Sequence, residues 1–323
     1  MKSRRLITLS IVAAILASSA PAFALDKVRM RLDWVFGAEH SGIFVAAQKD
    51  YFKDEGIEVE ILPGEGSSVT VKLVGTGDVE FGYATADQGV LAADRGLPVV
   101  TTAVILQSNP TAIIFPKSTG IKSLKDLYGK RLGLQLKSAV ERQWRAVSKS
   151  NDIDTTKINE VPADLAIAKL IIAGRIDAGV AFFFNDGLLA AAEGIDMDWL
   201  MFRDLGLPMY STGLITNADL IKKNPDLVRR FTKAFVRGWA YAKAHPDEAY
   251  ALTVKAHPEL DNKYNKLKLP AVLSLLDSAD TKAHGIGYSS KEGWDSLIGT
   301  MIKLDLLRKP VDVSSVYTND FLK

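Results

Sequence analysis

The first third of the chain alternates between strand-like and helix-like patterns of apolar residues. Apolar Val28, Met30 and Leu32 alternate with charged residues up to position 33, which is the two-residue period of a half-buried strand. Residues 41–54 instead place apolar side chains on one helical face, and Gly56 follows where a left-handed residue commonly ends a helix. Further strands are predicted at 57–61, 79–83 and 99–105, and further helices at 69–75 and 84–96. This alternation predicts an α/β domain with a mainly parallel sheet.

A second strand–helix series begins at residue 112. Its predicted strands are 112–115, 131–135, 159–161, 178–184 and 200–202, its helices are 138–151 and 164–173, and a short turn at 123–127 has Ser123 as candidate N-cap. The stretch 210–216 reads as a strand that returns toward the first series. We therefore predict two lobes, 25–108 with 211–323 and 109–210, joined by crossings near 107–111 and 208–214. Two lobes on such a two-strand hinge can close on a ligand.

The last third of the chain is predicted to be mostly helical. The stretch 225–244 is long and amphipathic, and one face carries Leu227, Phe231, Phe235, Val236 and Trp239. Shorter helices are predicted at 247–255, 268–278 and 291–304. We expect these helices to pack on the outside of the α/β lobes.

The N-terminal 24 residues have the pattern of a cleaved secretory signal. Lys2, Arg4 and Arg5 precede an apolar run at 6–17, and Ala22-Phe23-Ala24 is a small-x-small cleavage site. The apolar run is shorter than the roughly 20 residues that span a bilayer. We expect export, cleavage after Ala24 and a periplasmic location.

Composition narrows the functional classes. The chain has no cysteine, which excludes disulfides, thiolate metal sites, cysteine nucleophiles and a lipid-anchored cysteine. Removal of the leader leaves 37 basic residues against 38 acidic ones, so no overall charge attracts nucleic acid. We expect a monomer with no cofactor and no nucleic-acid partner.

In open α/β sheets, ligands bind at the carboxyl ends of the strands. We therefore take the residues that follow the predicted strands, and those at the crossings, as candidate ligand contacts. In the first lobe and at the crossings they are Trp34, His40, Gly66, Ser67, Ser68, Tyr83, Thr85, Gln107 and Tyr210, and in the second lobe they are Ser138, Phe184, Asn185 and Asp186. This set is rich in aromatic and hydroxyl groups and poor in paired catalytic groups.

Several of these residues allow a purely structural interpretation as well. Trp34 could stack on a planar solute or belong to the core, and His40 could face a ligand or begin a helix. The Gly-rich loop 64–68 could present backbone N–H groups, or form a turn in which Ser67 or Ser68 is an N-cap. Asp186 could accept a hydrogen bond from a ligand amine or cap the helix that follows it.

Catalysis finds little support in the sequence. The four histidines show no metal-ligand spacing, and no serine lies in a nucleophile-elbow pattern. We therefore expect a binding protein rather than an enzyme.

Several motifs resemble a known family. Leu32-Asp33-Trp34, His40-x-Gly42, the stretch 46–59, Gly75 to Gly82 and Gly120 to Lys130 are similar to solute-binding proteins of the nitrate, sulfonate and thiamine-pyrimidine type, the SsuA/THI5-like family. This resemblance implies a two-lobed, type II periplasmic-binding-protein fold and a transient membrane partner, the permease of an ABC importer.

Within that family, the opening motif is most like the branch that binds thiamine-pyrimidine precursors or flavin-type heteroaromatics, in which the tryptophan stacks on the ligand. Asn185-Asp186-Gly187 stands where that branch often has Trp-Glu-Gly, so the ligand could instead be a sulfonate, nitrate or an aromatic acid. Fungal relatives are pyrimidine synthases that consume their own histidine, which His40 resembles. They also need a Cys-rich iron motif, which a chain without cysteine cannot supply.

Overall fold

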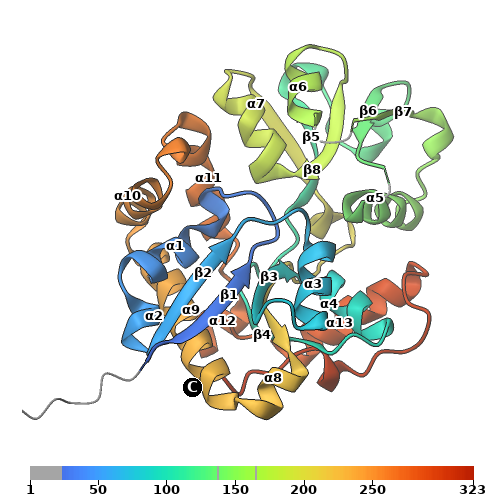
Figure 1. Ribbon diagram of the computed structural model, residues 1–323. Helices are drawn as coiled ribbons and strands as arrows, with labels where there is room; N and C mark the ends of the chain where they lie inside the picture. The colour runs from blue at the N-terminus through green and yellow to red at the C-terminus, as the bar shows by residue number, and fades with distance from the viewer. Residues whose placement is uncertain (1–23, 137, 164–165) are drawn as a thin grey trace, which may run out of the picture.

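The computed structural model describes residues 24–136, 138–163 and 166–323, arranged as two lobes (Figure 1). The predicted leader therefore lies outside the described residues except for Ala24, as do Lys137 and Asp164. Among the described residues, no helix is both long and apolar enough to cross a membrane.

Each lobe contains a five-stranded sheet with one antiparallel strand. The first sheet has the order β2-β1-β3-β10-β4, from β1 (Asp26–Arg31), β2 (Ile57–Leu62), β3 (Phe81–Thr85), β4 (Val99–Val104) and β10 (Thr212–Asn217). The second has the order β7-β6-β8-β5-β9, from β5 (Thr111–Pro116), β6 (Arg131–Leu134), β7 (Asn159–Pro162), β8 (Ala178–Phe182) and β9 (Met197–Met201). β10 runs antiparallel to β3 and β4, and β5 runs antiparallel to β8 and β9. The expected α/β fold with two mainly parallel sheets is confirmed.

The register of these two antiparallel strands places the carboxyl ends of the parallel strands of both sheets at the crossings. The first residue of β10, Thr212, pairs with Thr85 at the end of β3, and the first residue of β5, Thr111, pairs with Phe182 at the end of β8. The crossings themselves are hydrogen-bonded, because Ile105 and Leu106 both donate to the Thr212 carbonyl. The carboxyl ends of the parallel strands in both lobes therefore meet at the lobe junction.

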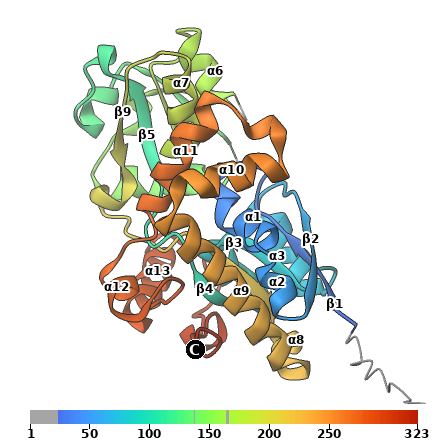
Figure 2. The ribbon, with the colours of Figure 1, turned by 90° about the vertical axis from the view of Figure 1, so that its left-hand side faces the viewer.

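Helices cover both faces of the first sheet. Phe81 of β3 stacks on Phe231 of α9 (Pro225–Ala244) with ring centroids 3.8 Å apart, whereas a Cβ at the next residue, Gly82, would meet Thr70 of α3 (Ser67–Thr76). Successive residues of a strand point to opposite faces, so α9 and α3 lie on opposite sides of the sheet (Figures 1 and 2). The other helices of this lobe are α1 (Ser41–Gln48), α2 (Tyr51–Asp54), α4 (Ala86–Asp94), α8 (Ala218–Lys223), α10 (Pro246–Ala256), α11 (Lys263–Ser274), α12 (Ala279–His284) and α13 (Lys291–Lys303).

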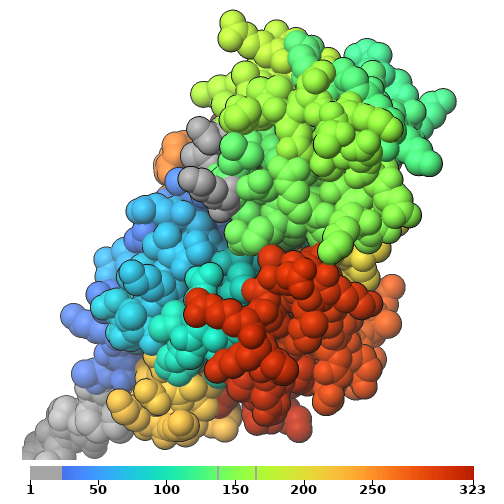
Figure 3. All heavy atoms as spheres, turned by 90° about the vertical axis from the view of Figure 1, so that its right-hand side faces the viewer, coloured from blue at the N-terminus to red at the C-terminus, as the bar shows by residue number. Residues whose placement is uncertain are grey.

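The second lobe has fewer and shorter helices. They are α5 (Ala139–Ser150), α6 (Ile167–Ile172) and α7 (Leu188–Ala192). In Figure 3 this lobe, in green, rests on the first lobe, whose C-terminal residues are red. The exact lobe boundaries at 108/109 and 210/211 stay a prediction.

The structure corrects three predicted elements. The helix at 41–54 is two helices, because Asp50 adopts a left-handed conformation with φ of 58°. The strand at 178–184 ends at Phe182, and a π-helical turn, η5 (Phe183–Gly187), follows it. The helix at 268–278 begins five residues earlier, at Lys263, so that Pro270 lies inside it rather than in its first turn.

The closest helix contact in the first lobe is between α1 and α9. A Cβ at Gly238 would lie 2.2 Å from the carbonyl oxygen of Gly42, which is backbone and cannot turn aside. We expect Gly238→Ala to destabilise the protein by about 1–3 kcal/mol through overpacking. Gly299→Ala is the matched control, because Gly299 lies in α13 with open space around it, and alanine there should stabilise by about 0.5–1 kcal/mol. Chemical denaturation checks both values, and a Gly238→Ala protein as stable as the unchanged one would contradict the close contact.

Candidate functional site at the lobe junction

The loop after β1 is held in place by the Gly-rich loop after β2. Gly64 N–H donates to the Trp34 carbonyl at 2.8 Å, and Gly66 N–H donates to the Asp33 carbonyl at 2.7 Å. Only glycine fits at position 64, because a Cβ there would lie 2.0 Å from the carbonyl oxygen of Leu32. The Gly66 N–H therefore positions the Trp34 loop, and its role as a ligand donor stays a prediction.

The two helices that begin at this edge are also joined. α3 begins at Ser67 with Gly66 as its N-cap, so neither Ser67 nor Ser68 caps it. The Ser67 hydroxyl accepts a hydrogen bond at 3.1 Å from the backbone N–H of Thr85, the residue that precedes α4. Ser68 is exposed. The structure thus brings Ser67 and Thr85 together at the carboxyl end of the sheet.

His40 and Tyr83 lie buried beneath this loop. His40 Nε2 is 2.9 Å from Asp33 Oδ1, and the two rings of His40 and Tyr83 meet edge to face with centroids 5.8 Å apart. The Tyr83 hydroxyl and His40 Nδ1 are buried and have no hydrogen-bond partner among the described residues. Burial, together with the negative charges of Asp33 and Glu39, raises the pKa of Tyr83 well above its usual value. Buried polar atoms are normally paired, so this cluster is arranged for an additional partner.

Trp34 follows Asp33 of this cluster directly in the chain and is partly exposed. Among the described residues no aromatic ring stacks on it, whereas the three most deeply buried tryptophans, Trp144, Trp239 and Trp294, are fully enclosed. The interpretation of Trp34 as a core residue is therefore the weaker of the two.

Helix α11 brings a charged group from the C-terminal third into the same cluster. Lys268 Nζ lies 2.6 Å from Glu39 Oε2, and both side chains are more than nine-tenths buried. Burial alone would raise the pKa of Glu39, but the Lys268 ammonium outweighs it and holds the pKa below its usual value. Burial likewise opposes the charge of Lys268, and Glu39 holds the pKa of Lys268 above its usual value. The pair is therefore ionised. The Asn265 side chain of α11 accepts a hydrogen bond from the Ala38 N–H at 3.1 Å.

The second lobe reaches the cluster through η5. Tyr264 of α11 donates to Asn185 Oδ1 at 3.4 Å, and Lys268 Nζ lies 5.9 Å from the centre of the buried Phe184 ring. Asp186 Oδ1 accepts a hydrogen bond from the Ala168 N–H at 2.9 Å, so Asp186 caps α6 rather than the helix that follows it. Burial raises the pKa of Asp186, and the Ala168 N–H and the charge of Lys268 oppose this only in part.

Three predicted contacts are engaged elsewhere. The Gln107 side chain bonds the carbonyls of Val104 and Tyr288 and accepts from Ser278, so it fastens the crossing. The Tyr210 hydroxyl bonds Asp280 and Ser290, each at 3.2 Å. Ser138 is the N-cap of α5 and accepts from the Glu141 N–H. Each of these polar groups already has protein partners, and their assignment as ligand contacts stays a prediction.

The sequence analysis missed four members of the cluster. They are Asp33, Glu39, Tyr264 and Lys268. Asp33 and Glu39 stand within the opening motif and could have been found from their place after the first strand. No local pattern marks Tyr264 or Lys268, because only the tertiary packing of α11 brings them to the junction.

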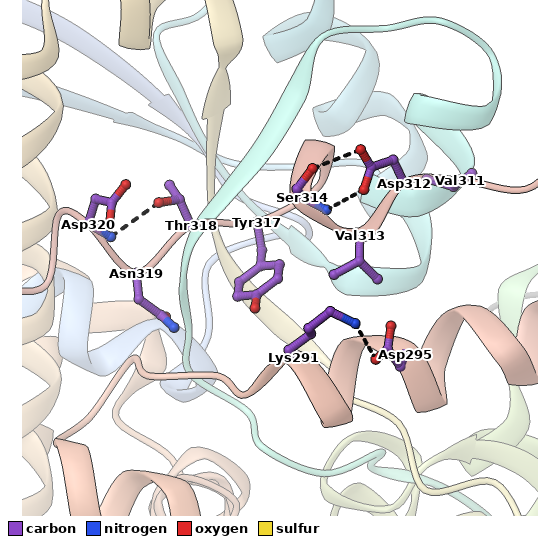
Figure 4. Close-up of a pocket in the computed structure, with 10 residues that line it drawn as sticks. All are labelled: Lys291, Asp295, Val311, Asp312, Val313, Ser314, Tyr317, Thr318, Asn319 and Asp320. Carbon is purple, nitrogen blue, oxygen red and sulfur yellow. Dashed lines mark hydrogen bonds and ion pairs between the residues drawn. The ribbon is translucent and has the colours of Figure 1, made fainter.

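An open surface pocket of about 710 Å³ lies elsewhere, between α13 and the C-terminal segment (Figure 4). Its polar groups are paired with one another: Lys291 lies 2.7 Å from Asp295, and Asp312 accepts hydrogen bonds from Ser314. The pocket contains no residue of the junction cluster. Within the described ranges there is also no group of three or more His, Asp or Glu that could hold a metal ion.

Comparison with known proteins agrees with this architecture. A 4-amino-5-hydroxymethyl-2-methylpyrimidine phosphate synthase of Saccharomyces cerevisiae is 28% identical over 311 residues, covering 92% of this chain and 88% of the yeast protein. A formylaminopyrimidine-binding protein of Halalkalibacterium halodurans is 24% identical over 327 residues, covering 99% of each chain.

The fold itself is that of periplasmic solute-binding proteins. The structure of a putative sulfonate-binding protein, SsuA, from Methylobacillus flagellatus superimposes with a TM-score of 0.67 at 18% identity and covers 93% of each chain. The sequence model of the family described as NMT1/THI5 like matches residues 37–249, which include Glu39, His40 and Tyr83 of the junction cluster. The chain therefore belongs to the NMT1/THI5-like family.

Proposed function

We propose that this protein is a periplasmic solute receptor of an ABC importer and that it captures a small, planar, nitrogen-containing solute between its lobes. The observation that carries the proposal is the cluster of Asp33, His40 and Tyr83, in which His40 Nδ1 and the Tyr83 hydroxyl are buried without a partner among the described residues and Asp33 is followed directly by the partly exposed Trp34. A flat ring on Trp34 would bury apolar area, and its amino or ring N–H groups could donate to Asp33.

The charge of the junction supports this ligand class over an anion. Asp33, Glu39 and Asp186 are three acidic side chains, and among the described residues of the cluster Lys268 is the single lysine or arginine, already paired with Glu39. A sulfonate, nitrate or aromatic acid would meet net negative charge there, and like charges at short range are unfavourable. A neutral or cationic heterocycle with hydrogen-bond donors suits the site.

The exported, periplasmic location, the cleaved leader and the permease partner belong to the same proposal. They are supported by the leader-like sequence of residues 1–24 and by the fold shared with SsuA. Closure of the two lobes over the solute would present a new surface to the permease.

A second candidate function is that of a pyrimidine synthase, which the identity to the yeast enzyme favours. His40 would then be consumed as the histidine of the yeast-type reaction. Purified protein that carries bound iron and forms a pyrimidine phosphate would support this candidate. A protein that only binds and releases an unaltered solute would contradict it.

A thermal-shift screen tests the ligand class. We expect stabilisation by 4-amino-5-hydroxymethyl-2-methylpyrimidine, formylaminopyrimidine or another planar nitrogen heterocycle, and none by alkanesulfonates, nitrate or benzoate. A ligand at 100 times its dissociation constant stabilises by about 2.7 kcal/mol, which is a clear shift. Stabilisation by the anions alone would contradict the proposed ligand.

Replacement of Trp34 tests the stacking platform. Trp34→Ala should weaken binding of the identified heterocycle by about 1–3 kcal/mol, because the ring loses its stacking partner. Val35→Ala is the matched control, since Val35 is 57% exposed in the same loop and should leave affinity unchanged. Calorimetric titration measures both, and a folded Trp34→Ala protein of unchanged affinity would exclude Trp34 from the site.

The buried Asp186 predicts a pH dependence of stability. Because burial raises its folded pKa, the folded state holds this proton more tightly than the unfolded state does. Its contribution to stability is therefore greatest below the ordinary value of 3.8 and is lost as pH rises through the raised folded value. Asp186→Asn, which can still accept from Ala168, should gain stability relative to the unchanged protein as pH rises. Denaturation at a series of pH values checks this, and a difference that stays constant with pH would contradict it.

A further inference from the structure

Helix α11 joins the two lobes at the ligand site. It contacts η1 (Ala38–His40) in the first lobe and both η5 and α7 in the second. Its first turn is fastened to the second lobe, because Lys263 Nζ donates to the Ala192 carbonyl at the end of α7 at 2.8 Å. Figure 2 shows α11 against α7, between the two lobes. A side chain in the middle of α11 can therefore act on residues of both lobes.

Lys268 is that side chain. Its ammonium group pairs with Glu39 of the first lobe, lies 4.7 Å from the centre of the Tyr264 ring, and lies 5.9 Å from the centre of the Phe184 ring of the second lobe. Its side chain is only 4% exposed. The cation is thus enclosed by one carboxylate and two aromatic rings, in an arrangement that fixes its position.

Stability alone does not account for this pair. Burying two charges carries a desolvation cost that their attraction often only balances, and apolar replacements of such pairs are often neutral or stabilising. What the pair does change is the charge that a ligand meets. With Glu39 compensated by Lys268, Asp33 is the acidic acceptor left in this cluster on the first lobe, and its Oδ2 has no hydrogen-bond partner in the part of the chain that the structure describes.

We propose that Lys268 is a positioning residue that sets the charge selectivity of the site by neutralising Glu39, so that the site accepts one donor or cationic group, at Asp33. This inference rests on the proposed function, because it concerns the ligand of the same site. Lys268 acts through Glu39 and not by contact with the ligand.

Three pyrimidines that share the same ring but differ in charge test the proposal. They are 4-amino-5-hydroxymethyl-2-methylpyrimidine, which is neutral, its 5-aminomethyl analogue, which is cationic, and its 5-carboxylate analogue, which is anionic. Calorimetry at pH 8 gives the affinity of each for the full chain and for Lys268→Met, Glu39→Gln, the double variant, and Lys266→Met. Lys266 is an exposed residue of the same helix, so Lys266→Met is the matched control.

We expect Lys268→Met to raise the ratio of cationic to neutral affinity about tenfold or more, because Glu39 is left uncompensated. Glu39→Gln should shift preference the other way, toward the anionic analogue, and provides the test if Lys268→Met does not fold. The double variant should return the ratio to that of the unchanged protein, and Lys266→Met should not alter it.

Three results would overturn the inference, and they can be told apart. If the variants bind all three pyrimidines more weakly by one common factor, the pair is only structural, and the role of Lys268 fails while the ligand class stands. A double variant that stays as altered as Lys268→Met would also remove Glu39 from the explanation. If the unchanged protein binds none of the three pyrimidines, the proposed function fails, and the inference fails with it.

Discussion

The constraint on which the structure depends is the reversal of one strand in each sheet. The chain leaves the first sheet after β4, enters the second through antiparallel β5, and returns through antiparallel β10. Each reversal points the carboxyl ends of the parallel strands toward the crossings. Residues from both lobes, such as Tyr83 in β3 and Asp186 after β8, then share one junction. Two lobes joined by two crossings are an arrangement that permits hinge closure on a ligand.

The chemistry of the junction follows from which groups are already paired. The N–H groups of Gly64 and Gly66 donate to backbone carbonyls of the Trp34 loop, and Lys268 forms an ion pair with Glu39. What remains is a flat ring, the Asp33 carboxylate and the hydroxyl of Tyr83. These groups suit recognition of a planar, donor-bearing solute, and the same framework in SsuA shows that the fold itself does not fix the ligand.

The sequence predicted those features whose signals are local. Helix α9 has the predicted bounds because Asn224 caps its start and His245 precedes a proline at its end. The prediction that strand β8 continues to Phe184 was wrong, because a continuous apolar run does not distinguish a strand from the π-helical turn that follows it. The contribution of α11 to the site could not be predicted, because Lys268 contacts Glu39, which lies 229 residues earlier in the sequence. Trp34 and His40 were selected from the sequence because they follow a predicted strand, and their contact with a ligand stays a prediction.

The most direct test of the central claim is a crystal structure of the protein with the heterocycle that stabilises it most. The account predicts the ring parallel to the Trp34 indole, with an N–H donor within hydrogen-bond distance of Asp33 and the Tyr83 hydroxyl engaged by the ligand. A ligand bound away from the junction, or bound there with Trp34 and Asp33 both free of contact, would contradict it.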